Sequence, residues 1–401
     1  MVTDIQQITP NVERVLSITG ITSGDERVKY LFRYMGILRM DSATAYDLLD
    51  ESLIPLNLTP HFQSENGQHV VIIQSGRVQA VQSNPWINLI FFLITLVSVI
   101  FTGAVNEYSG PSTASLFQVL WGSLIDWRSG LPFAVSLMAI LLAHEFGHYI
   151  VGRLNKSPLT LPYFIPLPAP FSPFGTMGAV IQMKAQTRNR RALLDIGLAG
   201  PLAGLIVAIP ILIYGLTLST VDILPTTPVD SFSMEGNSLL YLGLKYAIFQ
   251  QVLPEPASFG GLHPVLYWIR YFFTGKPFPW GGIDVNISPV AFAGWAGIFV
   301  TALNLLPVGQ LDGGHILYAL FGKKVKKLFP FILGITILLG FAWSGWWLWT
   351  ILLFFFGRVY DEPMDQITQL GTGRKVLAVI GLVIFFLVFT PIPLIITSVG
   401  P

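Results

Sequence analysis

Two histidines and a glutamate in the stretch LLAHEFGHYI have the types and the spacing that metal-dependent hydrolysis requires. His144, Glu145 and His148 form an H-E-x-x-H motif. In a helix the two histidines, four residues apart, lie on one face and can bind one Zn²⁺ ion. Glu145 lies between them in the sequence, where it can take a proton from a water molecule that the metal activates. The motif therefore predicts a zinc site that activates water.

The motif lies at the end of an apolar run, LPFAVSLMAILLA, in which residues 131–143 carry no charge. A helix over this run places two imidazoles and a carboxylate within a lipid bilayer. An unpaired charged side chain there costs roughly 2.5–3.5 kcal/mol on insertion scales, so polar groups at that depth generally mark a functional site. This setting favours a metal site over a chance occurrence of the motif.

Two histidines leave a catalytic zinc ion one protein ligand short, because such sites normally use three. The chain has no cysteine, so the third ligand has to be a histidine or a carboxylate. The candidates in apolar sequence are Asp195, Asp312 and His315. Asp312 is the best of them, because the adjoining Gly313 and Gly314 allow the backbone to present its short carboxylate to another helix.

The other two candidates are expected to act differently. His315 lies three residues after Asp312 and is expected to orient a metal ligand through a hydrogen bond. Asp195 is expected to pair with the neighbouring cationic side chains of Arg190 and Arg191. Neither is therefore expected to bind the metal directly.

The composition is that of a polytopic membrane protein. Of 401 residues, 52% are hydrophobic and 11% are charged, whereas charged residues make up about a quarter of a soluble protein. A net charge of +1 gives no indication of a nucleic-acid partner. The first fifteen residues, MVTDIQQITPNVERV, lack the apolar stretch of a cleaved signal peptide.

Apolar segments long enough to cross a bilayer begin after residue 85. Spans are expected at about residues 87–105, 131–154, 193–218 and 287–306. The segments LFPFILGITILLGF and SGWWLWTILLFFFG form either a tight helical hairpin or one long tilted helix, and VLAVIGLVIFFLVFT adds another helix. The fold class is therefore an α-helical membrane protein with about six to eight transmembrane helices.

Residues 157–184 are apolar but cannot form a regular helix across most of their length, because the segment contains Pro158, Pro162, Pro166, Pro168, Pro170 and Pro173. Irregular backbone at membrane depth is tolerated against protein or a water-filled cavity. We expect a re-entrant loop whose GAVIQM portion is a short strand with a free edge. An interfacial linker is the alternative.

The expected span at residues 193–218 is rich in small residues, namely Gly197, Ala199, Gly200, Ala203 and Gly204. Small residues at this spacing let a neighbouring helix approach closely, so we interpret them as packing residues. The segment 219–285 that follows is polar to amphipathic, and its apolar stretches either lie on the membrane surface or insert in part.

Residues 1–85 are expected to form a small soluble α+β domain, and residues 86–401 a membrane domain with its core at about 131–320. A capping box of Ser23 and Glu26 predicts a helix over residues 28–40, and SATAYDLLDESL predicts a second helix. HFQS, QHVVIIQ and RVQAV are expected to be short strands joined by turns. His61 and His69 are interpreted as surface residues of these strands.

Basic residues gather at the expected helix ends that share one side of the membrane, in the clusters Arg153 to Lys156, Lys184 to Arg191, Lys323 to Lys327 and Arg358 to Arg374. The positive-inside rule makes this side cytoplasmic. The N-terminal domain and the H-E-x-x-H motif are then expected toward the same side.

A second motif, N-x-x-P-x-x-x-L-D-G-G, runs from Asn304 through Pro307 and Leu311 to the Asp312-Gly-Gly sequence. Together with H-E-x-x-H it resembles the site-2 protease family of intramembrane zinc metalloproteases, and most closely the cyanobacterial and chloroplast EGY-like type. FGTMGAVIQMK followed by NRRALLDIGLAGPLAGL resembles the segment that links the two motif helices in that family. The resemblance covers roughly residues 87–320.

The resemblance implies Zn²⁺ as the cofactor, His144, His148 and Asp312 as its ligands, and Glu145 as the catalytic acid and base. Asn304 either hydrogen-bonds the substrate or simply satisfies a helix carbonyl. The implied reaction is peptide hydrolysis within or near a transmembrane segment, as in regulated intramembrane proteolysis. The substrate is expected to be a single-span membrane protein that is unwound at the site and held by strand addition on residues 178–183.

The implied location is a multi-pass position in a cytoplasmic or thylakoid membrane, with the active site toward the cytoplasmic or stromal side. Two other functions remain as alternatives. A zinc or ion transporter would normally show an internal repeat with paired sites, and no second H-E-x-x-H is present. A catalytically inactive scaffold would tend to lose Glu145, which is present.

Overall fold

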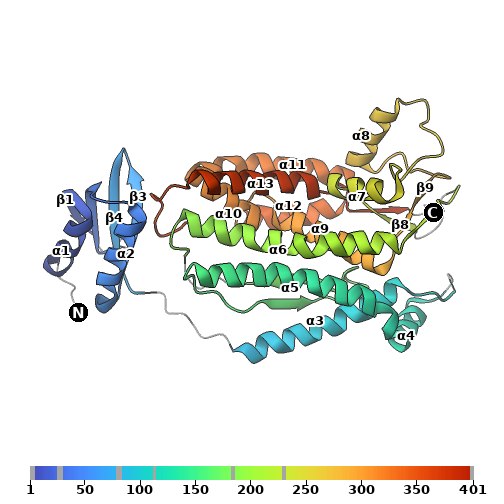
Figure 1. The fold of residues 1–401 in the computed structure, drawn as a ribbon, viewed down its shortest axis with the longest axis horizontal. Coiled ribbons are helices and arrows are strands. Elements are labelled where there is room, and N and C mark those ends of the chain that lie inside the picture. Colours follow the sequence, from blue (N-terminus) through green and yellow to red (C-terminus); the bar gives the residue numbers. More distant parts are fainter. Residues whose placement is uncertain are drawn as a thin grey trace.

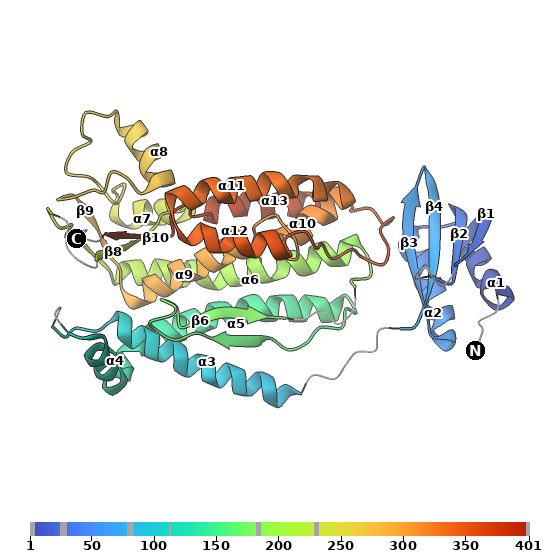
Figure 2. The same cartoon turned by 180° about the vertical axis from the view of Figure 1, so that it is seen from behind.

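A bundle of helices makes up most of the molecule, and a small sheet domain lies beyond one end of it (Figure 1). The computed structural model describes residues 5–24, 30–77, 84–111, 114–181, 186–227 and 232–397. Figure 2 shows the same arrangement from behind, with the sheet domain again separate from the helices except at one end.

The N-terminal domain is a four-stranded antiparallel sheet with helices on one face. Its elements are α1 (Ile5–Val15), β1 (Leu16–Ser23), β2 (Phe32–Leu38), α2 (Ser42–Leu53), the 3-10 turn Ile54–Leu56, β3 (Leu58–Glu65) and β4 (Gln68–Ser75). The strand order is β1-β2-β4-β3. Ile8, Val12, Leu49 and Phe62 are among the residues of a core between the helices and the sheet.

The predicted helix over residues 28–40 is wrong, because residues 32–38 form strand β2. This strand is central in the sheet, paired with β1 on one side and β4 on the other. Tyr34 and Gly36 are buried at alternate positions, and a Cβ on Gly36 would meet the Ser17 carbonyl oxygen at 2.0 Å. Hydrogen bonding on both edges therefore overrides the local helical spacing. Glu26 of the predicted capping box, and most of RVQAV, lie outside the described residues.

Within the part of the chain that the structure describes, four helical segments are long and apolar enough to cross a membrane. They are α3 (Pro85–Asn106), Trp127–Leu154, α6 (Arg190–Thr217) and Asp312–Ala342. The second joins a 3-10 turn (Trp127–Gly130) to α5 (Leu131–Leu154), and the fourth joins α10 (Asp312–Phe321), a 3-10 segment (Gly322–Leu328) and α11 (Phe329–Ala342). Three of the expected spans are thus matched by helices of sufficient length.

The span expected at residues 287–306 is the shorter helix α9 (Pro289–Asn304), with 16 residues. Pro307 and the turn before α10 end it early. The other helices are α4 (Leu116–Ile125), α7 (Leu239–Phe249), α8 (Pro264–Thr274), α12 (Gly345–Phe356) and α13 (Thr372–Val388). Helices α11 and α12 form a tight hairpin, which decides between the two alternatives for this segment, and Trp347 packs so closely on Gly340 that a Cβ there would meet its ring at 2.8 Å.

The proline-rich loop runs along α3 and contains the hairpin of β5 (Tyr163–Pro166) and β6 (Thr176–Val180). The Asn88 side chain donates to the carbonyl of Pro162, and Ser98 donates to that of Gly175. Thr102 accepts from the backbone N–H of Ala169. These contacts extend over about 21 Å of helix at about 1.5 Å per residue. The loop's backbone is therefore satisfied against protein beside a candidate span.

Two further strand pairs lie at the end of the bundle remote from the N-terminal domain (Figure 1). Strand β7 (Thr220–Ile223) pairs with β9 (Ile283–Asn286), and β8 (Phe232–Glu235) pairs with β10 (Leu394–Thr397). Helices α7 and α8 lie between these strands in the sequence, at the same end.

Helices α5, α6 and α9 form the centre of the bundle, and glycines allow their close approach. A Cβ on Gly147 of α5 would meet the Ala199 carbonyl oxygen of α6 at 2.6 Å. A Cβ on Gly294 of α9 would meet Leu212 of α6 at 2.7 Å. The small residues of α6 thus do pack against neighbouring helices, as their spacing predicts.

The N-terminal domain docks on the α12–α13 connection, residues 357–371. The Phe62 N–H donates to the Met364 carbonyl (2.8 Å), and the Gln366 N–H donates to the Phe62 carbonyl (2.9 Å). Ser42 donates to the buried Asp365 carboxylate (2.8 Å). On its other side the connection bonds to the start of α6, where the Asp365 N–H donates to the Arg188 carbonyl (2.9 Å). The domain is therefore joined to two parts of the bundle through one short segment.

Candidate metal centre

His144 and His148 lie one turn apart on α5, at the interface with α6. Both side chains are buried, and their Nε2 atoms are 3.2 Å apart. His148 Nδ1 lies 2.8 Å from the carbonyl oxygen of Ile196. Because a carbonyl oxygen accepts hydrogen bonds, Nδ1 must carry the proton, which leaves the lone pair of Nε2 free for a metal.

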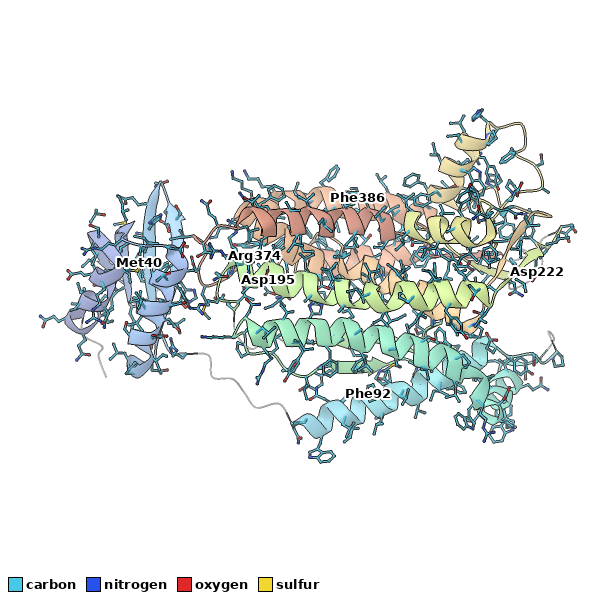
Figure 3. The ribbon with its side chains drawn as sticks, in the orientation of Figure 1. Met40, Phe92, Asp195, Asp222, Arg374 and Phe386 are labelled. Carbon is cyan, nitrogen blue, oxygen red and sulfur yellow. The ribbon has the colours of Figure 1, made fainter. Side chains whose placement is uncertain are left out.

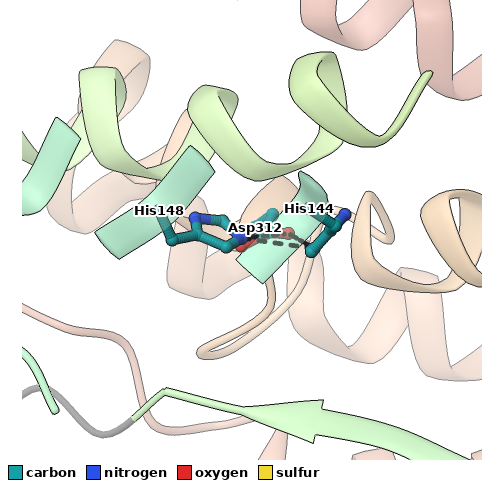
Figure 4. Close-up of side chains that lie close together, drawn as sticks. All are labelled: His144, His148 and Asp312. Carbon is teal, nitrogen blue, oxygen red and sulfur yellow. Dashed lines mark hydrogen bonds and ion pairs between the residues drawn. The ribbon is translucent and has the colours of Figure 1, made fainter. Parts of the chain in front are cut away.

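Asp312 comes to the two histidines from the first residue of α10. Its Oδ2 lies 3.4 Å from His144 Nε2 and 3.3 Å from His148 Nε2, and the three side chains point toward one another (Figure 4). Gly313 and Gly314, which follow Asp312, pack against backbone carbonyl groups so closely that a side chain would not fit. A Cβ on Gly313 would meet the Leu305 carbonyl oxygen at 2.0 Å, and a Cβ on Gly314 would meet the Gly309 carbonyl oxygen at 2.2 Å.

The three side chains fit a zinc ion. Two imidazole nitrogens and one carboxylate oxygen are a ligand set of catalytic zinc sites. Ligand atoms about 2.0–2.1 Å from a tetrahedral zinc ion are about 3.3–3.4 Å from each other, and the separations here are 3.2, 3.3 and 3.4 Å. Among the described residues, this is the group of histidines and carboxylates whose ligand atoms converge, all within 4.8 Å of one another.

Glu145 and Asn304 adjoin this group. Glu145 is buried and lines, with the three other side chains, a cavity of about 510 Å³. Asn304, the last residue of α9, has its Nδ2 3.2 Å from His144 Nε2. Ala179 and Val180 of strand β6 line the same cavity. A carboxylate, an amide and a strand therefore share one space with the candidate ligands.

Both motifs lie within a region that matches a known peptidase family. The model of peptidase family M50 matches residues 132–342, just over half of the chain, and includes both motifs. The chain belongs to peptidase family M50. This match confirms the predicted resemblance to site-2 proteases. The family and the three candidate ligands both indicate zinc as the cofactor.

Similar proteins from plants extend the M50 match. "Probable zinc metalloprotease EGY1, chloroplastic" of Arabidopsis thaliana is 30% identical over 323 residues, which are 76% of this chain and 53% of that protein. The rice (Oryza sativa subsp. japonica) protein of the same name is 31% identical over 77% of this chain and 50% of its own length. "Probable zinc metalloprotease EGY2, chloroplastic" of Oryza sativa subsp. indica is 28% identical over 66% of this chain and 43% of that protein. The chain spans about half the length of these relatives.

Asp195 and Arg190 have different ion-pair and hydrogen-bond partners from those predicted from the sequence. Asp195 pairs with Arg374 at the start of α13, at 2.9 Å, rather than with the adjacent arginines (Figure 3). Arg190 donates instead to the carbonyls of Ala319 and Leu320. These partners lie more than 120 residues away in the sequence, so the local pattern could not identify them.

His315 lies in the wall of the metal cavity, but its hydrogen bond goes to the α12–α13 connection. Its Nε2 is 3.0 Å from Asp361 Oδ2. The structure therefore shows a hydrogen bond from His315 to Asp361, and not the predicted hydrogen bond from His315 to a metal ligand. His69 accepts from the Leu38 N–H in the N-terminal sheet, 3.0 Å away, and is far from this centre.

Two glycines of α6 face the candidate ligands, a role that the sequence interpretation missed. A Cβ on Gly200 would meet His148 Nε2 at 2.0 Å, and a Cβ on Gly204 would meet His144 Nδ1 at 3.2 Å. The equal spacing of the two pairs could have indicated this contact, because both the glycines and the histidines are four residues apart. These glycines therefore provide the room that the imidazole rings occupy.

Proposed function

We propose that the chain is a zinc-dependent endopeptidase that cuts membrane proteins within or near a transmembrane segment. The observation that supports this most is the convergence of His144, His148 and Asp312, from two apolar helices, on one point beside Glu145. The names of the plant relatives and membership of family M50 support the same reaction class.

In this proposal His144, His148 and Asp312 hold the zinc ion. Once held there, zinc supplies Lewis acidity, which activates water and polarises a carbonyl group. Glu145 takes a proton from the attacking water and delivers it to the leaving amide nitrogen. With the lone pair of His144 Nε2 occupied by metal, the Asn304 amide is free to donate to the substrate carbonyl as negative charge develops on it.

Strand β6 presents the substrate. It pairs with β5 along one edge, and no other described strand pairs with its second edge. Residues 179–181 line the metal cavity. A helical substrate hides its peptide groups, so the scissile segment has to unwind and add to the free edge as a strand. Met183, at the far end of the predicted strand edge, lies outside the described residues.

The membrane arrangement is part of the same proposal. Residues 86–401 form the membrane domain, with about six to eight transmembrane helices and a re-entrant loop that contains β-strands, and its core is at about 131–320. Residues 1–85 lie on the side of the basic helix ends, which the positive-inside rule makes cytoplasmic or stromal. The relatives' names end in "chloroplastic", which favours the thylakoid over the cytoplasmic membrane. The metal site lies toward the side of the basic helix ends in this proposal.

The test compares Glu145→Gln with the unchanged chain on a purified single-span substrate. We expect cleavage to fall by about 10²–10⁴-fold while bound zinc is retained. Glu255→Gln, at an exposed carboxylate, is the matched control and should cut normally. Full cleavage by the Glu145 variant would contradict the proposal, and zinc flux into vesicles without any cleavage would favour a transporter.

A further inference from the structure

The sheet of the N-terminal domain has one open face. Thr59, His61 and Gln63 alternate along β3 with residues of the core, and their cross-strand neighbours on β4 include Ile72 and Gln74. These side chains point away from α1 and α2 and line a cavity of about 940 Å³. No described helix covers them.

The opposite wall of this cavity is the α12–α13 connection, through residues 359–364 and Gln366. We call the space between this wall and the open sheet face the domain cleft. The two walls are held in register by the backbone hydrogen bonds between Phe62 and residues 364 and 366. One wall of the domain cleft is thus a β-sheet, and the other is a connection that is hydrogen-bonded to the edge strand of that sheet.

The domain cleft leads to the metal centre. Asp361 lines both the domain cleft and the metal cavity. Gln186 also lines the domain cleft, and it follows the substrate strand β6 by six residues of sequence. We infer that a chain continuing beyond β6 enters the domain cleft at Asp361, which the two cavities share.

The charged side chains of the domain cleft are paired, and its other polar side chains are uncharged; they include Thr59, His61, Gln63, Gln74 and Gln366. Asp361 is engaged by Gln310 and His315, and Glu362 by Lys326. Arg77 is paired with Asp50. Burial lowers the pKa of His61, although a hydrogen bond with Gln74 opposes this, so the imidazole is neutral at pH 7. Amide and imidazole groups of this kind recognise peptide backbone and polar side chains with little preference for charge.

We propose that the domain cleft holds the polar segment that adjoins the transmembrane span of the substrate, in extended form, while the scissile bond lies at the metal centre. This inference rests on the proposed function. The volume is at the upper end of the range of about 300–1,000 Å³ found for ligand pockets, and the polar lining suits a hydrated segment rather than a lipid tail. The substrate class is accordingly a single-span protein with a polar tail on the side of the N-terminal domain.

The chain's lack of cysteine makes a cross-linking test direct. Gln74→Cys is combined with Glu145→Gln, so that the substrate stays uncut, and a single cysteine is placed in the polar segment of a single-span test substrate. We expect cross-linking at Gln74→Cys and none at the control Glu13→Cys, on an exposed position of α1 behind the sheet. Equal cross-linking at both positions, or none at Gln74→Cys, would overturn the inference.

A second experiment fills the domain cleft with Gln74→Trp and measures kinetics on two versions of the substrate. One carries a polar segment of about 20 residues, and in the other this segment is trimmed to about three residues, which span about 10 Å at about 3.3 Å per residue. The trimmed segment is too short to lie along the domain cleft. We expect KM to rise about tenfold for the long version, with kcat unchanged, and no change for the trimmed one.

The outcomes separate the two proposals. Equal effects of Gln74→Trp on both substrates, or no effect on either, would overturn the domain cleft as a binding site while leaving the protease intact. Absence of cleavage by the unchanged chain would overturn the proposed function itself, and this inference with it.

Discussion

His315 Nε2 lies 3.0 Å from Asp361 Oδ2, and this contact joins the helix of a candidate zinc ligand to the segment on which the N-terminal domain docks. Asp361 also accepts from Gln310, just before α10 (2.9 Å). Burial by itself would raise the pKa of Asp361, but hydrogen bonding and charge from His315 lower it below its ordinary value. The first turn of α10, with Asp312, is therefore anchored by a carboxylate from a distant connection.

Removing that anchor should loosen the metal site. In Asp361→Ala the His315 ring and the Gln310 amide lose their acceptor, so we expect zinc affinity to fall about tenfold, in the range of outer partners of metal ligands. A competition titration with a zinc indicator measures this. Glu362→Ala is the control, because its pair with Lys326 is partly exposed and contributes little. Equal losses in both variants would contradict the anchoring role.

The room for the imidazole rings gives a steric prediction. Gly200→Ala puts a methyl group 2.0 Å from the present position of His148 Nε2, so the ring has to move. We expect zinc affinity to fall by about 10–100-fold with little change in helix content by circular dichroism. Gly334→Ala, in α11, meets nothing within 4 Å and should bind zinc normally. Unchanged affinity in Gly200→Ala would show that the ring is placed differently.

A buried charge cluster predicts how stability depends on pH. Glu235, on β8 and outside the four candidate spans, accepts from Tyr241 (2.7 Å), and Lys245 lies 3.3 Å from Asp284 in the same cluster. Burial, and next the nearby Asp284 carboxylate, raise the pKa of Glu235 to about 7, against the opposing charge of Lys245. Tyr271 of α8 also faces the cluster.

A carboxyl with a raised pKa holds its proton more tightly in the folded state than in the unfolded state. Its contribution to stability is complete below the ordinary pKa of 4.5 and is lost as the pH rises through about 7. We therefore expect Tm in detergent to fall by about 3 °C from pH 5 to pH 8. Glu235→Gln should flatten this slope, and an unchanged slope in that variant would contradict the assignment.

Much of the site was predictable because its chemistry is local. The spacing of His144 and His148 depends on helix geometry alone, and the glycines around Asp312 indicated a tight turn, which the structure has. The absence of cysteine left few residue types for a third ligand. Three of the long helices follow equally well from length and apolarity.

The remainder depends on contacts between distant segments. Residues 32–38 satisfy a helical pattern, but pairing with two strands makes them β2. Asp195 bonds to Arg374, 179 residues away, rather than to its neighbours. The docking of Phe62 on Met364 joins segments about 300 residues apart. Local sequence patterns do not identify partners that are distant in the sequence. For Asp195 they indicated neighbouring arginines, and for Phe62 they indicated no partner.

The most direct test of the account is the zinc content of the purified protein and its aspartate variants. We predict about one zinc ion per chain for the unchanged protein and loss of most of it in Asp312→Ala. Asp195→Ala, which removes the other aspartate considered as a ligand and breaks its pair with Arg374, should retain the metal. Zinc retained at full occupancy by Asp312→Ala, or lost from Asp195→Ala instead, would contradict the account.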